Sequence, residues 1–320
     1  MRKLKVLIVA DPLDALKPES DTSLFLAHEF LKKDFEVCWA VVDDLIWSGV
    51  GLTVRFRSLE GFELRSKPKV TNESVAPMDE FSAVMIRKDP PFDESYQRMC
   101  WMLAPYEHKM PMINKPSQLI RYHEKMLPYE AIAQGFLTED ELIPMSLATK
   151  NRDLEEFVKR FPSPSYVVKP WLGFGGQDIL QKNHEELLRE DFSKIFSLSK
   201  HFIVQPFVDE ISEHGDRRVF FIHGHYAGSF VRLPPQGGFV SNLAQGGTAE
   251  ARDLNRDQRK VIAKLEKFMH SLGIVFAGAD LIGAKVSEIN ITSPTGLLKL
   301  LELTGDNRAE ELTRGIVSSG

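Results

Sequence analysis

The sequence has few of the residues and motifs that nucleophilic enzymes and zinc sites require. Only two cysteines, Cys38 and Cys100, occur in 320 residues, and neither has a CxxC partner. Both lie in apolar runs, so we interpret them as small buried hydrophobic residues rather than disulfide or zinc ligands. There is no GxSxG elbow, and none of the nine histidines falls in an HExxH pattern. Nucleophilic catalysis therefore finds little support.

Long apolar runs and an excess of basic charge are also missing. The net charge is −5, and no long basic stripe occurs, which argues against nucleic acid as a partner. No segment approaches the roughly 20 apolar residues that span a bilayer. The apolar run at residues 4–10 is followed at once by acidic residues and not by a signal-peptide cleavage site. We therefore expect a cytoplasmic protein without a membrane partner.

The order of predicted elements indicates a mixed α/β fold. Apolar segments at residues 4–9, 37–42 and 83–86 predict buried strands of a parallel sheet, and Asp21 can cap a helix between the first two. Alternating segments around residues 54–64 suggest a small hairpin or excursion. Further along, helices are predicted at 124–133, 153–160 and 255–273, and strands at 166–170, 202–205, 219–222, 226–232, 275–282 and 285–291.

Two turns of acidic residues and proline, Asp11-Pro12 and Asp89-Pro90-Pro91, follow predicted strands. The carboxyl ends of parallel strands are where ligands usually bind in open α/β sheets. The alternative is ordinary turn chemistry, because such pairs end strands anywhere.

The segment Ser287-Glu288-Ile289-Asn290-Ile291 carries the clearest chemical signal. Alternation along a strand places Glu288 and Asn290 on one face, and a turn at Gly283 brings Asp280 roughly opposite Glu288. Carboxylate and amide oxygens are suitable ligands for Mg²⁺. The alternative is a solvated polar face without metal.

A lysine followed by a glycine loop, Lys169-Pro170 and Gly173-Phe174-Gly175-Gly176, suggests phosphate binding, although it is neither a Walker sequence nor GxGxxG. An ordinary turn is the alternative. The polar, glycine-bracketed segment 237–247 predicts a mobile cover over a site. Arg218 and Arg232, on neighbouring predicted strands, could bind carboxylates or phosphates, or could form surface salt bridges.

Together these motifs resemble the ATP-grasp superfamily, and specifically the bacterial glutathione synthetase family, over nearly the whole chain. The similarity is carried by several blocks: Asp11-Pro12 with Ser23, Arg87-Lys88-Asp89-Pro90-Pro91-Phe92, Asn114-Lys115-Pro116, Glu124-Lys125, Lys169-Pro170, Gly215-Asp216-Arg217-Arg218-Val219 and Glu288-Ile289-Asn290-Ile291-Thr292-Ser293-Pro294-Thr295. The last block is the most specific.

The resemblance implies an ATP-grasp fold with an N-terminal Rossmann-like domain at 1–122, a central lid at 123–200 and a C-terminal domain at 201–320. It implies a ligase that joins γ-glutamylcysteine and glycine through an acyl phosphate, with ATP as co-substrate, Mg²⁺ or Mn²⁺ as cofactor, and a homotetrameric assembly.

The resemblance also assigns residues to roles. ATP would be bound by Lys125, Lys169, Gly175, Gly176, Gln205, Pro206, Phe207 and Asp216, and the metal by Asp280, Glu288 and Asn290. The substrate carboxylate would be placed by Arg218, Arg232, Asn290, Ser293 and Thr295, of which Arg218, Arg232 and Asn290 are the expected catalytic residues.

This chain departs from the family pattern at two places. Leu172 stands where the family usually has Asp, and Phe239, Val240 and Ser241 occupy a stretch that usually contains Glu and Arg. The altered loop leaves a ligase for another dipeptide or amino acid as an alternative. A regulator that binds nucleotide without turnover is a further alternative, against which the retained lysines and metal ligands argue.

Overall fold

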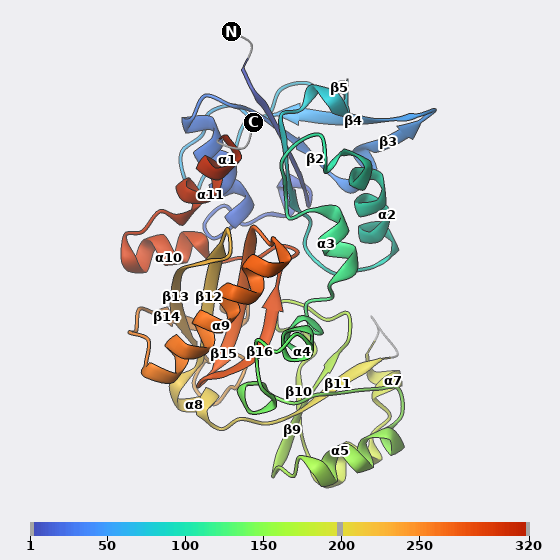
Figure 1. Cartoon of the computed structure of the whole chain (residues 1–320), viewed down its shortest axis with the longest axis vertical. Coiled ribbons are helices and arrows are strands. Elements are labelled where there is room, and N and C mark those ends of the chain that lie inside the picture. Colours follow the sequence, from blue (N-terminus) through green and yellow to red (C-terminus); the bar gives the residue numbers. More distant parts are fainter. Residues whose placement is uncertain (1–2, 197–200, 318–320) are drawn as a thin grey trace.

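The computed structural model describes residues 3–196 and 201–317, which form three β-sheets with helices packed on them (Figure 1). The first sheet is built from residues 5–113, the second from residues 146–206 and the third from residues 216–290. No helix in the described residues is long and apolar enough to cross a membrane. The division of the chain at residues 122 and 200 stays a prediction.

The first sheet has the order β3-β4-β2-β1-β6-β7, and β5 pairs with β4. Its centre is parallel, as predicted, because β1 pairs in parallel with both β2 and β6. Antiparallel strands β3 and β4 form the hairpin expected near residues 54–64, although it begins earlier. The strands are β1 (Lys5–Ala10), β2 (Glu36–Ala40), β3 (Leu45–Ser48), β4 (Gly51–Ser58), β5 (Ser74–Pro77), β6 (Ala83–Arg87) and β7 (Met112–Ile113).

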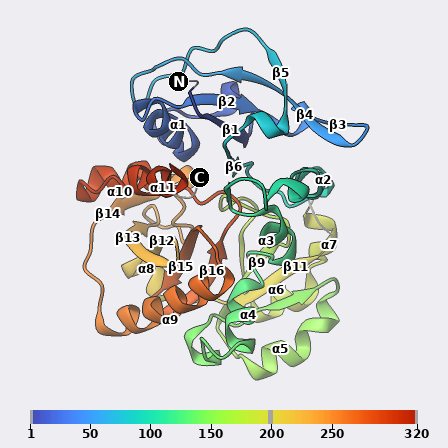
Figure 2. The ribbon, with the colours of Figure 1, turned by 45° about the horizontal axis from the view of Figure 1, so that its top comes forward.

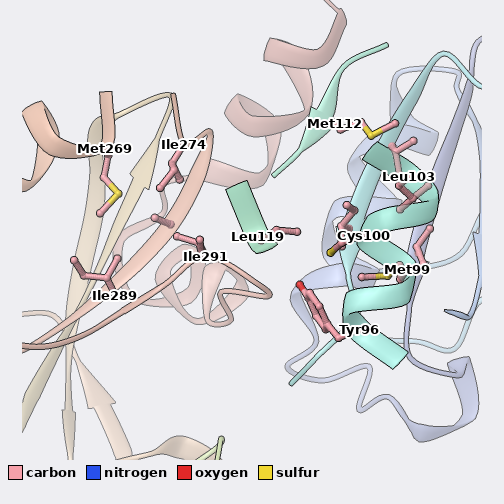
Figure 3. Close-up of a cluster of buried hydrophobic side chains, with 14 of the residues drawn as sticks. Tyr96, Met99, Cys100, Leu103, Met112, Leu119, Met269, Ile274, Ile289 and Ile291 are labelled. Atoms are coloured by element: carbon pink, nitrogen blue, oxygen red, sulfur yellow. The ribbon is translucent and has the colours of Figure 1, made fainter. Parts of the chain in front are cut away.

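Three helices accompany this sheet: α1 (Thr22–Lys32), α2 (Glu94–Leu103) and α3 (Pro116–Arg121). Asp21 caps α1 as predicted, since its carboxylate accepts the Leu24 N–H at 2.7 Å. Helix α2 was not predicted. Its buried residues Tyr96, Met99, Cys100 and Leu103 point to one side in Figure 3. Leu119 of α3 lies between them and Ile291, the residue that follows the third sheet.

The second sheet is antiparallel, has the order β10-β9-β11-β8, and packs its own apolar core around Tyr166, Phe192 and Phe202. Its strands are β8 (Ser146–Ala148), β9 (Ser165–Pro170), β10 (Leu180–Asn183) and β11 (Phe202–Pro206), with helices α5 (Glu155–Arg160), α6 (His184–Arg189) and α7 (Phe192–Ile195). Helix α4 (Leu127–Ala133) precedes it and begins three residues later than expected.

The third sheet has the order β14-β13-β12-β15-β16 and is antiparallel. Its strands are β12 (Asp216–Ile222), β13 (His225–Leu233), β14 (Thr248–Glu250), β15 (Phe276–Ile282) and β16 (Lys285–Asn290), and α8 (Glu210–His214) precedes them. The predicted long helix is α9 (Arg256–Leu272). Asn255 caps it by accepting the N–H groups of Asp257 and Gln258, and Gly273 ends it with φ at +64°.

The last two helices, α10 (Leu297–Thr304) and α11 (Arg308–Val317), return to the first sheet, beside α1 (Figure 2). Leu312 and Ile316 share one apolar core with Val6 and Phe25. Lys33, just after α1, donates to the Glu310 carbonyl at 2.8 Å and to Thr313 Oγ1 at 2.6 Å. The end of the chain therefore completes the core of its beginning.

Asn114, at the end of β7, joins the first sheet to the third. Its Nδ2 donates to the carbonyls of Phe276 at 2.6 Å and Ile291 at 2.7 Å, and its Oδ1 accepts the N–H groups of Val275 and Phe276 at 3.1 and 2.9 Å. The side chain is only 2% exposed, so these bonds are shielded from water. They fix the edge of the first sheet against the ribbon of β15 and β16.

Candidate active site

A cavity of about 280 Å³ lies where the three sheets meet. Its wall contains every site residue predicted from the sequence, although these residues are spread over 171 positions from Lys125 to Thr295. They are Lys125, Lys169, Gly175, Gly176, Gln205, Pro206, Phe207, Asp216, Arg218, Arg232, Asp280, Glu288, Asn290, Ser293 and Thr295. The fold therefore brings these residues together. Which ligand each one contacts stays a prediction.

Strands β15 and β16 form the predicted oxygen-rich ribbon. Asp280 is the register partner of Glu288, and Gly278 is the partner of Asn290. Ile289, between the two polar residues, is fully buried on the other face, as strand alternation requires. Asn290 Nδ2 lies 3.4 Å from Asp280 Oδ2, and Glu288 Oε1 lies 3.9 Å from Lys125 Nζ.

Asp216, Arg218, Arg232 and Asp280 form a buried arginine–aspartate cluster on β12, β13 and β15. Arg218 grips Asp280 with two hydrogen bonds, at 2.7 and 3.1 Å. Arg232 Nη2 lies 3.0 Å from Asp280 Oδ1. The same arginine donates to the Asp216 carboxylate through Nε, at 2.8 Å, and through Nη2. The four side chains are 8–12% exposed, so these are not surface salt bridges.

The cluster shifts the ionisation of Asp280 and Arg232. Burial alone would raise the pKa of Asp280, but the facing Arg218 and Arg232 guanidinium groups hold that pKa below its ordinary value. Burial opposes the charge of Arg232, yet Asp216 and Asp280 raise the pKa of this arginine above its ordinary value. Asp280 and Arg232 thus stay charged and face one another beside the cavity.

Two lysines supply positive charge on the other side of the cavity. Lys125 Nζ donates to the Gly173 carbonyl at 2.7 Å, which ties it to the glycine loop. Burial lowers the pKa of Lys169 at the end of β9, while the negative charge of Glu288 opposes that change. Lysines beside glycine N–H groups are a suitable environment for phosphate oxygens.

Residues 239–242 of the segment 237–247 line this cavity, as expected for a cover. The Phe239 ring meets the Phe207 ring edge-on at 5.8 Å between centroids, and Ser241 is only 5% exposed. Gly176 of the glycine loop, with φ at +78°, has room for no side chain, because a Cβ there would lie 2.9 Å from Val240 Cγ1. The two loops therefore interlock in this closed arrangement. Whether the cover moves stays a prediction.

Sequence reasoning gave no role to Glu124 or to His123. Glu124 accepts the N–H groups of Ile291 and Thr292 at 2.8 Å each and the Thr292 hydroxyl at 2.6 Å, which holds the end of the ribbon. His123 stacks on Trp171 at 3.8 Å and 13°, and burial followed by the Lys125 charge lowers its pKa to about 4. Their positions directly before Lys125 in the sequence were the available signal.

Family models agree with this geometry. The model described as the ATP-grasp domain of prokaryotic glutathione synthetase matches residues 133–305, and the model of the N-terminal domain of the same family matches residues 4–121. The chain belongs to the prokaryotic glutathione synthetase family. The resemblance drawn from the motifs is therefore confirmed, as is the expected class, an ATP-dependent carboxylate–amine ligase.

Relatives of this family match over nearly their whole length. A glutathione synthetase from Prochlorococcus marinus subsp. pastoris is 31% identical over 313 residues, which are 97% of each chain. Another, from Rhodopseudomonas palustris, is 26% identical over 318 residues, which are 97% of this chain and 96% of the relative.

Solved structures with lower identity show the same fold. D-cycloserine synthetase DcsG superposes with a TM-score of 0.69 at 17% identity. The superposition covers 98% of this chain and 99% of DcsG. The ATP-grasp ligase PsnB, complexed with a minimal precursor, gives a TM-score of 0.63 at 13% identity, with full coverage of both chains. The predicted ATP-grasp fold, of mixed α/β class, is confirmed.

Asp280→Asn is expected to lower the free energy of unfolding by about 3 kcal/mol near neutral pH, because it leaves two buried guanidinium groups short of an anion. The pKa of Asp280 is lower in the folded state than its ordinary value of 3.8. The stabilisation is therefore complete above about pH 4 and declines as the pH falls below that value. Urea unfolding of both proteins between pH 7 and pH 3 measures this difference.

The exposed Asp14→Asn serves as a matched control, since the same chemical change there should leave the stability close to that of the wild type. A stability difference between Asp280→Asn and the wild type that stays constant down to pH 3 would contradict the charge-pairing explanation.

Proposed function

We propose that this chain joins the cysteinyl carboxylate of γ-glutamylcysteine to the amine of glycine, with conversion of ATP to ADP and phosphate. One observation carries the proposal: in a member of this family, the lysines, the glycine loop and the oxygen-rich ribbon line a single cavity. Family membership and the full-length relatives speak against the alternatives of another substrate pair or a regulator without turnover.

The reaction has two steps. A carboxylate oxygen attacks the γ-phosphorus of ATP, the bond to the bridging oxygen breaks, and ADP leaves with that electron pair. The glycine amine then attacks the carbonyl carbon of the acyl phosphate, the carbon–oxygen bond to phosphate breaks, and the amine gives up a proton. No protein nucleophile is needed, so positioning, charge neutralisation and exclusion of water supply the acceleration.

The cavity residues suit these tasks. Lys125 and Lys169 place positive charge where the phosphates would lie, beside the N–H groups of Gly175 and Gly176. Gln205, Pro206 and Phe207 at the end of β11 would meet the adenine. Asp216, which also lines the cavity, would contribute to ATP binding as well. Arg218, Arg232, Asn290, Ser293 and Thr295 would place the substrate carboxylate. Arg218 and Arg232 both already bind the Asp280 carboxylate, so the substrate carboxylate would share these two guanidinium groups with Asp280.

The donor set fits a hard divalent cation. Glu288 and Asn290 present oxygens on one face, and Asp280 stands opposite Glu288. Among the described residues, no cluster of three or more His, Cys, Asp or Glu side chains could bind a metal, so the amide of Asn290 and the nucleotide phosphates would complete the coordination. Mg²⁺ or Mn²⁺ held there would neutralise charge on the phosphates. The cytoplasmic location and the tetrameric assembly stay predictions.

Purified protein incubated with ATP, Mg²⁺, γ-glutamylcysteine and glycine tests the proposal. We expect phosphate and tripeptide in equal amounts. Phosphate release only with a different acid and amine would favour another ligase. ATP binding without phosphate release in any mixture of acid and amine would favour a regulator.

Glu288→Gln is expected to lower kcat by about 100-fold or more and to change the affinity for nucleotide by much less, because the charge on this carboxylate matters most during phosphoryl transfer. Steady-state kinetics and ATP titration measure the two effects. Glu60→Gln, the same change at an exposed position, is the control. An unchanged kcat in Glu288→Gln would remove this residue from the metal site.

Gly176→Ala is expected to uncouple ATP use from ligation, because its methyl group would collide with Val240 and hold the cover away from the glycine loop. Water would then reach the acyl phosphate. The yield of tripeptide per phosphate released would fall by about a factor of ten, which corresponds to a change of about 1–2 kcal/mol in the relative barriers of ligation and hydrolysis. Gly175→Ala is the matched control, since its φ of +64° gives similar backbone strain but nothing lies within 4 Å of a Cβ there. Equal uncoupling in both variants would show that backbone strain, and not the collision, is responsible.

A further inference from the structure

The rings of His123 and Trp171 lie face to face, with 3.8 Å between their centroids and planes 13° from parallel. Both residues line the cavity, yet neither belongs to the expected ATP, metal or substrate residues. His123 lies in the connection between α3 and α4, whereas Trp171 directly follows β9 and precedes Gly173 of the glycine loop. The stack therefore joins the segment that leaves the first sheet to the loop that is suited to bind phosphate.

The ring of His123 is itself held in place. Its Nδ1 accepts the Lys125 N–H at 3.3 Å, and the Phe92 ring meets it edge-on at 6.1 Å between centroids. Glu124, the next residue, accepts the Ile291 N–H at 2.8 Å, so the backbone that carries His123 is fastened to the end of the ribbon. Burial and the Lys125 charge lower the pKa of His123 to about 4, so the ring is neutral at pH 7 and Nδ1 can accept this bond.

The glycine loop needs support of this kind. Glycine loses more conformational freedom on ordering than any other residue, so a disordered glycine loop would bind phosphate weakly. Gly175 and Gly176 both have positive φ, at +64° and +78°. Gly176 packs against Val240 of the cover, but that contact depends on the position of the cover.

The start of the loop is held by contacts that do not involve the cover. Trp171 stacks on His123, its N–H donates to the His201 carbonyl at 3.0 Å, and Lys125 Nζ donates to the Gly173 carbonyl at 2.7 Å. Lys125 is also an expected phosphate ligand, so its amine has a second task once a nucleotide is bound. The stack has no such second task, because neither ring carries a charge that would attract a phosphate.

We propose that His123 is a positioning residue for ATP, because its stack with Trp171 holds the glycine loop in the phosphate-binding arrangement before the nucleotide arrives. This inference rests on the proposed function only in that ATP phosphates bind at this loop. ATP then need not supply the free energy that orders the loop. Loss of the stack should therefore weaken ATP binding and leave kcat at saturating ATP nearly unchanged, because bound ATP restores the loop.

A double-mutant cycle isolates the stack from other effects of the two residues. The wild type, His123→Ala, Trp171→Leu and the double variant are titrated with ATP and Mg²⁺ by calorimetry, without acid or amine. Each single variant is expected to raise the Kd for ATP by about 3- to 10-fold, the size of one aromatic pair. The double variant should raise it by no more than the larger single change, since both substitutions remove the same contact.

Two further variants serve as controls. His123→Phe keeps a flat ring for Trp171 and should bind ATP within about twofold of the wild type. Phe157→Ala removes the contact between Phe157 and Phe161, whose ring centroids lie 5.2 Å apart outside the cavity, and should leave the Kd for ATP unchanged. If Trp171→Leu does not fold, the comparison of His123→Ala with His123→Phe tests the same contact.

Single losses that multiply in the double variant would overturn the inference, because the two residues would then act separately. So would an equal loss in His123→Ala and His123→Phe, or a fall in kcat with an unchanged Kd for ATP. The wild type keeps these outcomes distinct from failure of the proposed function. A wild type that binds ATP without joining γ-glutamylcysteine to glycine would sink the proposed substrates and leave the cycle intact, whereas a wild type that binds no ATP would sink both.

Discussion

The buried arginine–aspartate cluster is the interaction on which the arrangement of the site depends. Asp216, Arg218, Arg232 and Asp280 come from three adjacent strands, and each charge meets its partner only when these strands pair in one register. A shift by a single residue would turn every one of these side chains to the other face, where apolar residues form the core. The cost of burying an unpaired charge therefore selects the register that also places Glu288 and Asn290 beside the cavity.

The other cavity residues come from parts of the chain outside the arginine–aspartate cluster. Lys125 follows the connection from the first sheet, Lys169 ends a strand of the second, and the glycine loop and the cover close over both. The two lysines lie on the side of the cavity that faces Glu288, whereas the charges of the arginine–aspartate cluster pair with one another. The cavity thus combines a rigid set of paired charges with two lysines that can meet the phosphates of a nucleotide.

Patterns among neighbouring residues in the sequence predicted many of the helices and strands. The cap at Asn255, the stop at Gly273 and the alternation of Glu288, Ile289 and Asn290 each depend on neighbouring residues alone, and all three are confirmed. Helix α2 was missed although its apolar residues have helical spacing, because Met99-Cys100-Trp101 reads as a simple apolar run. The pairing of Arg218 with Asp280 could not be predicted, since it joins residues 62 positions apart through strand register.

Helices α10 and α11 have a consequence for how the protein is made. Val6 and Phe25 lie near the start of the chain, but their core is completed by Leu312 and Ile316 near its end. A ribosome that works at about 5–20 residues per second exposes this unfinished apolar surface for on the order of 15 to 60 seconds before the last helix emerges. The first sheet is therefore made before the other two sheets but sealed only once α11 is in place, and during that interval its apolar surface is open to misfolding and association.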